Sequence, residues 1–286
     1  MSTLVEILSP GFLLRDALAG SVLVGIVCPL VGVYFVLRRM IFLGVTLPQL
    51  SAAGIAFAFL MRAHVPVGGP MLARLGASVF TLSGILVLAA FERRGREIVE
   101  ARIGVTYAAA GALTILFLAV DPYGEAQMVN LLKGDLLATT TTSLTVLAGV
   151  FGAVVIVLLA FQKEFLLVSF DRDLAVVFGK AASLWDTVLY LVCGVTISFG
   201  VLTAGPLVTF GFLVAPPLTA RLLTRHMMSF SIASAAIGGL AAFAGFYCAY
   251  HYDVPLGPAE VAIATALLCL VGAAAWLRQA LRPRAA

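Results

Sequence analysis

The sequence predicts an all-α, polytopic integral membrane protein with about eight to ten transmembrane helices. Of its 286 residues, 62% are hydrophobic and only 11% are charged, and the mean hydropathy is +1.10. A soluble chain of this length needs more polar residues to cover its surface. Apolar stretches that approach the width of a bilayer recur along the chain, without a soluble domain or long linker between them. We therefore expect residues 1–286 to form a single transmembrane domain.

Stretches without charge define nine candidate spans. Several are shorter than the roughly 20 residues that a straight span needs, so tilted, broken or re-entrant helices are expected. The second and the seventh are the weakest. The candidates lie at about 17–37, 47–61, 75–91, 103–120, 144–161, 187–202, 207–220, 230–250 and 261–277.

The sixth and seventh spans form one uncharged run between Asp186 and Arg221, interrupted by Gly205-Pro206 and by Pro216-Pro217. This pattern predicts two helices joined by a tight outer turn, the second distorted near its inner end. Such breaks persist in a membrane only where protein or a water-filled path satisfies the freed carbonyl groups. The prolines therefore indicate either a translocation pathway or a packing kink.

Basic residues follow every odd-numbered span. The opposite loops, in which we expect Asp253 and Glu260, are poorer in arginine and richer in acid. This bias predicts a cytoplasmic C-terminus and an outer N-terminus. It also accounts for the pI of about 9.0, so no nucleic-acid partner is implied. The basic residues are Arg38, Arg39, Arg93, Arg94, Arg96, Lys163, Arg172, Lys180, Arg221, Arg225, Arg278, Arg282 and Arg284.

A charged interruption at residues 169–179 separates two apolar runs and retains helical apolar spacing. Phe170, Leu174 and Phe178, together with Val177, fit an apolar face. The charges at 171–173 would orient such a helix at its start. The segment therefore indicates either a docking element on the cytoplasmic side or an ordinary amphipathic connector.

The sequence lacks the motifs of several catalytic classes. Gly179-Lys180-Ala181 is not preceded by the glycine of a P-loop, and Ala181 cannot replace its magnesium-binding Ser or Thr. There is no HExxH motif, and the three histidines fall in different loops. No predicted span holds a histidine that would serve as a catalytic base. We expect neither an enzyme nor a chain that binds its own cofactor.

Five stretches, in order and with matching spacing, resemble the membrane permeases of bacterial zinc, manganese and iron ABC transporters. The resemblance runs along almost the whole chain. It is carried by Val36-Leu37-Arg38-Arg39-Met40-Ile41-Phe42-Leu43-Gly44, Ile103-Gly104-Val105 with Ala109 to Leu113, Leu132-Lys133-Gly134-Asp135-Leu136-Leu137, Ser169 to Gly179, and Tyr252-Asp253-Val254-Pro255-Leu256-Gly257-Pro258.

The resemblance implies a type II ABC importer-like permease in the bacterial cytoplasmic membrane. It implies a homodimer around a central path, a dimeric ATPase that holds ATP and magnesium inside, and a solute-binding protein outside. The cargo would be zinc, manganese, iron or a metal complex. It also implies that residues of about 169–182 form the coupling segment that docks into the ATPase. The ATPase-coupling residues would be Phe170, Asp171, Asp173, Leu174, Ala175, Phe178 and Gly179.

The second span departs from the family pattern. Related permeases usually carry Asp and His, thought to guide the metal, where this chain has Val45 and Gln49. An isopropyl group and an amide do not replace a carboxylate and an imidazole as metal ligands. We therefore assign no metal site and expect either transient metal contacts or another cargo. The candidate path residues are Thr46, Gln49 and Ser51, which either line a substrate route or bond across helices.

Two other functions remain open at this stage. A secondary transporter or channel would carry buried ionisable residues, and the predicted spans contain none, which counts against it. A non-transporting membrane scaffold derived from a permease would explain the loss of Asp and His at Val45 and Gln49.

Overall fold

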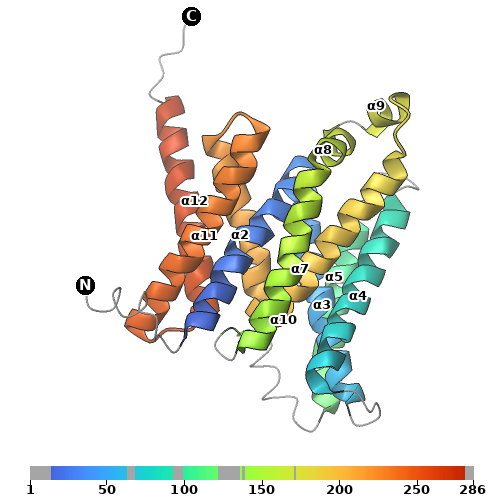
Figure 1. Cartoon of the computed structure of the whole chain (residues 1–286), viewed down its shortest axis with the longest axis vertical. Helices are drawn as coiled ribbons and strands as arrows, with labels where there is room; N and C mark the ends of the chain where they lie inside the picture. The colour runs from blue at the N-terminus through green and yellow to red at the C-terminus, as the bar shows by residue number, and fades with distance from the viewer. Residues whose placement is uncertain are drawn as a thin grey trace, which may run out of the picture.

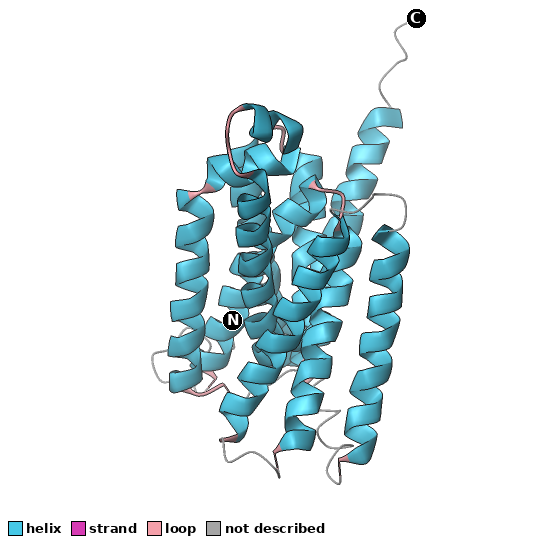
Figure 2. Ribbon diagram, turned by 90° about the vertical axis from the view of Figure 1, so that its right-hand side faces the viewer, coloured by secondary structure: helices cyan, strands magenta, loops and turns pink. Residues whose placement is uncertain are grey.

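The structure is a computed structural model that describes residues 14–62, 68–92, 99–121, 136, 139–170 and 172–280. The described chain is helical throughout, with no strand (Figures 1 and 2), so the all-α prediction is confirmed. The helices are α2 (Arg15–Leu37), α3 (Ile41–Met61), α4 (Gly69–Glu92), α5 (Val99–Val120), α7 (Thr141–Ala160), α8 (Gln162–Phe170), α9 (Arg172–Val177), α10 (Ala182–Leu223), α11 (Met227–Tyr252) and α12 (Leu256–Ala280).

Eight of the described helices are long and apolar enough to cross a membrane; α8 and α9 are too short. The longest, α10, has 42 residues, about twice what one crossing needs. Gly205 breaks it, with φ 84° and ψ 165°. A Cβ at Gly200 would lie 3.0 Å from Cγ2 of Thr209, although nine residues of continuous helix would separate them by about 13 Å. The chain therefore reverses at Gly205.

The predicted turn at Gly205-Pro206 is confirmed by this reversal, which makes α10 a helical hairpin. With the hairpin counted as two crossings, the described helices agree with the nine expected spans. Thr209 Oγ1 stabilises the turn by donating to the Gly205 carbonyl at 2.8 Å. Pro216 and Pro217 remain inside the returning helix.

The described helices begin before the expected starts of their spans, and the difference is largest for α3 and α4. The expected start of the second span at residue 47 is wrong, because α3 begins at Ile41 and continues through Pro48. Residues 41–43 are apolar and extend the helix. Likewise α4 begins at Gly69 rather than near residue 75. The second span is therefore a full crossing of 21 residues rather than a weak one.

The α10 hairpin lies at the centre of the bundle, where it packs against α2, α3, α4, α11 and α12. Glycines allow neighbouring backbones to approach closely. A Cβ at Gly54 of α3 would collide with the Gly76 carbonyl of α4, and one at Gly25 of α2 would lie 2.8 Å from the Gly238 carbonyl oxygen of α11. These contacts are the small-residue packing that is typical of membrane helices.

The two ends of the bundle differ in composition. The α2–α3 turn, α8, α9, both ends of α10 and the end of α12 lie at the upper end in Figure 1, whereas α2 begins and α11 turns into α12 at the lower end. The upper end carries the arginines that follow α2 and α10, and the lower turn carries Asp253. Among the described residues, the basic loops that the sequence assigned to one side of the membrane thus lie at one end of the bundle, and the turn with Asp253 lies at the other end.

Candidate functional site

The charged interruption at residues 169–179 contains the end of one short helix and the whole of another. Helix α8 ends at Phe170, and α9 covers only Arg172–Val177. Asp171 lies outside the described residues, and so does the side chain of Asp173, so these two expected coupling residues are not located. The helix is shorter than the apolar spacing over residues 169–179 suggested.

Apolar side chains on and beside α9 point away from the bundle. Phe170 is 69% exposed, Val177 80% and Phe178 66%, and Leu174 is also exposed. Ala175, in contrast, is fully buried and packs with Val168 and Ala182. An exposed apolar patch of this kind is a candidate for contact with a partner protein or with lipid. Among the expected coupling residues whose side chains are described, Phe170, Leu174 and Phe178 thus face outward and Ala175 makes an internal contact.

Gly179 ends this segment by its conformation. Its φ is +70°, its N–H donates to the Val176 carbonyl at 2.9 Å, and the N–H of Lys180 donates to the Ala175 carbonyl at 3.0 Å. These paired bonds form a Schellman motif, in which glycine takes the left-handed position without a steric penalty. Gly179 therefore stops α9 and directs the chain into α10.

Aromatic rings hold α8 against the membrane helices. Trp185 of α10 lies with its ring centroid 5.0 Å from that of Phe161 and 5.9 Å from that of Phe165. Phe165 also meets Tyr34 of α2 edge to face, with centroids 6.0 Å apart. Because Phe165 is fully buried, α8 is attached to the bundle by packing rather than by its surface charges.

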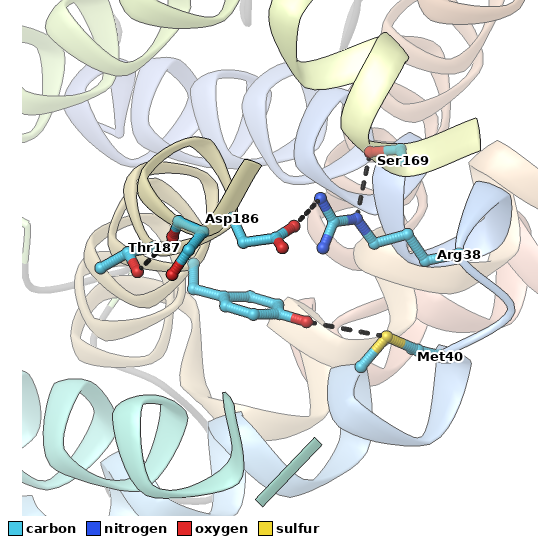
Figure 3. Close-up of polar contacts among 7 residues, drawn as sticks. Arg38, Met40, Ser169, Asp186 and Thr187 are labelled. Carbon is cyan, nitrogen blue, oxygen red and sulfur yellow. Dashed lines mark hydrogen bonds and ion pairs between the residues drawn. The ribbon is translucent and has the colours of Figure 1, made fainter. Parts of the chain in front are cut away.

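Arg38, at the end of α2, makes polar contacts with two other elements (Figure 3). Its guanidinium lies 2.8 Å from the Asp186 carboxylate of α10, and its Nε donates to Ser169 Oγ of α8 at 3.0 Å. It also lies over the Tyr190 ring, 5.3 Å from the centroid. The Tyr190 hydroxyl donates in turn to Met40 Sδ at 3.9 Å.

The surroundings of Arg38 favour its charged form. The Arg38 and Asp186 side chains are only 9% and 12% exposed. Burial by itself lowers the pKa of Arg38, but Tyr190 and Asp186 oppose this effect, and the pKa is raised above its ordinary value. The sequence marked Arg38 only as a basic loop residue and Asp186 as the limit of an uncharged run. Neither signal indicated that they meet.

The candidate path residues lie on α3, and Thr46 has a structural partner. Thr46 is buried and donates to the carbonyls of Phe42 at 3.1 Å and of Ile103, in α5, at 3.4 Å. It therefore bonds across helices, one of the two alternatives left open by the sequence. Gln49 is half-buried and also faces α5, where its Nε2 would lie 3.4 Å from a Cβ at Gly111. Ser51 is buried, and its Oγ has no hydrogen-bond partner among the described residues.

The described residues contain no group of three or more His, Cys, Asp or Glu side chains that could hold a metal ion. Gln49 lies on the side of α3 that faces α5, and Val45 lies about one helical turn before it; the resemblance would place His and Asp at these two positions. No metal ligands are therefore assigned to this chain.

Glu260 is a buried ionisable residue that the sequence analysis placed wrongly. It was expected in an outer loop, but it lies in α12 and is fully buried. Ser21 of α2 donates a hydrogen bond to its Oε1, whereas Oε2 has no hydrogen-bond partner in the described part of the chain. Close packing with Gly245 of α11 brings α12 inward: a Cβ there would lie 2.5 Å from the Glu260 Cα.

The spans are consequently not free of charge, since Glu260 lies within α12 and Asp186 within α10. The expectation of uncharged spans is therefore wrong, and the charge content of the spans does not exclude a secondary transporter.

Residues 12–275 match the family model described as the ABC 3 transport family. The chain belongs to this family. The family consists of the membrane subunits of ABC transporters rather than of enzymes, and ATP is hydrolysed by a separate subunit. Membership implies a multi-pass protein of the inner membrane that associates with an ATPase and a solute-binding protein.

Relatives in this family are similar over most of their length. The manganese transport system membrane protein MntC of Halalkalibacterium halodurans is 26% identical over 257 residues, 90% of this chain and 85% of that protein. The manganese import system permease protein ScaB of Streptococcus gordonii is 24% identical over 90% of this chain and 89% of its own. A Haemophilus influenzae membrane protein named for iron transport is 24% identical over 93% and 91%.

Solved structures show the same fold. PsaBC from Streptococcus pneumoniae, in complex with Fab, has a chain that superposes with a TM-score of 0.81 at 24% identity over 94% of each chain. An inward-facing ABC transporter described as metal-chelate type gives a TM-score of 0.73 at 15% identity, over 91% of this chain and 85% of the other. The overall helical fold is therefore shared with these solved chains.

Proposed function

We propose that this chain is the permease subunit of an ABC importer for a divalent transition metal, with manganese as the first candidate. The names of the relatives support this cargo, since MntC and ScaB are named for manganese and the Haemophilus influenzae protein for iron. Zinc remains a further candidate from the sequence resemblance. The chain acts as one transmembrane permease domain over residues 1–286 and binds no cofactor of its own.

The observation that carries the proposal is the exposed apolar patch around α9, next to the central hairpin. Phe170, Leu174 and Phe178 are the anchors that enter a groove of the ATPase, in the manner of interface hot spots. Asp171 and Asp173 orient the docked segment through their charge. Ala175 and Gly179 fix α9 to the permease by packing and by the turn into α10. Residues 169–182 are thus the coupling segment.

Two copies of the permease pair around a central path, with the coupling segments on the cytoplasmic side. The bias of Arg and Lys toward the end that carries α8, α9 and the C-terminus supports this orientation. Closure of the ATPase dimer on ATP moves the coupling segments and rocks the helices that line the path, so that it opens to alternate sides. Gln49 contributes to the path, with Thr46 and Ser51 in supporting positions on α3.

A second cargo class, a metal complex, is favoured by one observation. Val45 and Gln49 provide neither a carboxylate nor an imidazole on α3. A coordinated metal arrives with its own ligands and does not need protein ligands during passage. A neutral amide at Gln49 is suited to hydrogen bonding with such a complex.

Substitution of Phe178 tests the docking role. Phe178→Ala should abolish co-purification of the ATPase and cargo uptake, because one of the two exposed phenylalanine anchors is lost. Leu240→Ala is the matched control, since Leu240 is 67% exposed on α11, away from the coupling segment. Intact assembly and uptake in Phe178→Ala would overturn the assignment of the coupling segment.

Uptake by proteoliposomes that contain the permease, its ATPase and its binding protein tests the cargo. We expect ATP-dependent uptake of Mn²⁺ in preference to Fe²⁺ and Zn²⁺, and reduced uptake in Gln49→Ala. Uptake of a chelated metal, without uptake of any free ion, would identify a metal complex as the cargo. If no metal ion and no chelate were taken up, the chain would be a non-transporting scaffold.

A further inference from the structure

We propose that Arg38 is a positioning residue that transmits the movement of the coupling segment to the membrane helices. This inference rests on the proposed function, because it assumes that residues 169–182 receive the force from the ATPase. Its basis is the cluster of Arg38, Ser169 and Asp186, in which one guanidinium contacts two elements that flank the coupling segment (Figure 3).

The two partners of Arg38 lie at the two ends of the segment. Ser169 is the second-last residue of α8, immediately before the exposed Phe170. Asp186 is on the first turns of α10, just after the chain leaves Gly179. Arg38 therefore bridges the two elements from which α9 and the exposed apolar patch project, α8 and α10. A force on the patch reaches the bundle through this bridge.

Arg38 is itself fixed to α2 and to the turn that leads into α3. Its N–H donates to the Tyr34 carbonyl at 3.0 Å, and that of Met40 donates to the Phe35 carbonyl at 2.9 Å. Tyr190 of α10 lies beneath the guanidinium and reaches Met40. The turn thus contacts α10 at two successive points, so that a shift of α10 acts on the beginning of α3.

The chemistry of the cluster requires arginine. The planar guanidinium donates from Nε to Ser169 while a terminal nitrogen faces Asp186, and its flat surface lies over Tyr190. A lysine ammonium at the same position is a single point donor, which would keep the charge near Asp186 and lose the simultaneous bond to Ser169. The side chains are largely buried, so water does not replace the lost contact.

The mechanical consequence concerns α3, which carries Gln49. The α2–α3 turn is the shortest covalent route from Arg38 to the proposed path. Coupling through Arg38 therefore links docking of the ATPase at α9 to the conformation of α3. Energetic coupling of this kind requires a contiguous set of contacts between the two sites, and the contacts of Arg38, Tyr190 and Met40 provide its first steps.

The test is the number of metal ions transported per ATP hydrolysed, with Mn²⁺ as the probe in the reconstituted complex. Arg38→Lys should fold, retain the ATPase and hydrolyse ATP, but transport about fivefold less Mn²⁺ per ATP, or lower still. Arg225→Lys is the matched control, because Arg225 is exposed in the turn after α10 at the same end of the bundle. It should transport as much Mn²⁺ per ATP as the unmodified protein.

Further variants separate transmission from a merely structural role. Ser169→Ala should lower transport per ATP and Ser169→Thr should restore it, because threonine keeps the hydroxyl acceptor. In a double-mutant cycle, Asp186→Asn should have a smaller effect in Arg38→Lys than alone.

If folded Arg38→Lys transported as much Mn²⁺ per ATP as the unmodified protein, the inference would be overturned. It would also be overturned if Arg38→Lys lost ATPase binding in proportion to its loss of thermal stability. The proposed function fails separately, if the unmodified protein neither binds the ATPase nor transports a metal.

Discussion

Ser21 of α2 donates a hydrogen bond to Glu260 of α12, which ties the first described helix to the last across 239 positions of the chain. Both side chains are fully buried, and the second carboxyl oxygen has no hydrogen-bond partner among the described residues. A buried polar group contributes to stability only while it is paired, so the serine largely determines whether Glu260 is tolerated at this position.

Loss of the Ser21 hydroxyl should destabilise the permease. Ser21→Ala should lower the free energy of unfolding by about 1–3 kcal/mol, because the Glu260 acceptor is left without its donor. Glu260→Gln should cost less, since the amide keeps the acceptor oxygen. Thermal unfolding in detergent measures both. Ser83→Ala is the control, because Ser83 is exposed on α4 and donates to the Phe80 carbonyl of its own helix. Equal effects of Ser21→Ala and Ser83→Ala would contradict this account.

The close approach of α3 and α4 should not accept a methyl group. Gly54→Ala should lower the free energy of unfolding by about 1–3 kcal/mol, because its Cβ meets the Gly76 carbonyl. Gly149→Ala, on α7, provides the comparison, since no atom lies within 4 Å of the new Cβ. There the higher helix propensity of alanine, worth up to about 1 kcal/mol, should dominate. Thermal melting of the two variants should therefore shift in opposite directions.

Two glycines with positive φ should respond differently to asparagine. Gly205, at φ 84° and ψ 165°, occupies a region that is essentially restricted to glycine, and Gly205→Asn should cost about 1–3 kcal/mol. Gly179 closes a Schellman motif, where asparagine is also found, so Gly179→Asn should cost less than about 1 kcal/mol. Folded yield by size-exclusion chromatography and thermal unfolding compare them. If Gly179→Asn lost more stability than Gly205→Asn, the backbone geometry of the hairpin turn would not be what requires glycine at position 205.

The two turns that flank α11 should be accessible from opposite sides of the membrane. In Arg225→Cys, a membrane-impermeant thiol reagent should react from the cytoplasmic side, and in Asp253→Cys from the outer side, because charge places the basic end inside. The unmodified protein measures the background labelling of the native cysteines, of which Cys28 and Cys193 are buried, Cys248 is half-buried and Cys269 is exposed. Labelling of both variants from the same side would exclude a full crossing by α11.

The sequence predicted the spans well because their signals are local. Uncharged stretches mark the crossings, and Gly205-Pro206 marks the reversal within α10. The second span was expected from about residue 47, whereas α3 begins at Ile41 and contains Pro48 well inside it. Proline within a membrane helix is tolerated where neighbouring helices pack around the break.

The polar contacts were not predictable, because they depend on helix packing between distant segments. An acidic residue shortly after Asp253 and Pro255 resembles a loop residue, and only the position of Ser21 on α2 explains why Glu260 is inside. Arg38 and Asp186 each look like ordinary end-of-span charges until the structure places them 2.8 Å apart. Thr46 was correctly identified as polar at membrane depth, but its partner, the Ile103 carbonyl, became known only from the packing of α3 on α5.

The reversal at Gly205 also bears on biosynthesis. The chain between Asp186 and Arg221 contains no charged residue that would mark the position of the turn during membrane insertion. The turn at Gly205 therefore has to form while the two halves of α10 enter the lipid together. If α10 were straightened, Arg221 and Arg225 would be drawn toward the far side, and α11 and α12 would insert upside down. The backbone conformation of Gly205 therefore determines the membrane orientation of the helices that follow it.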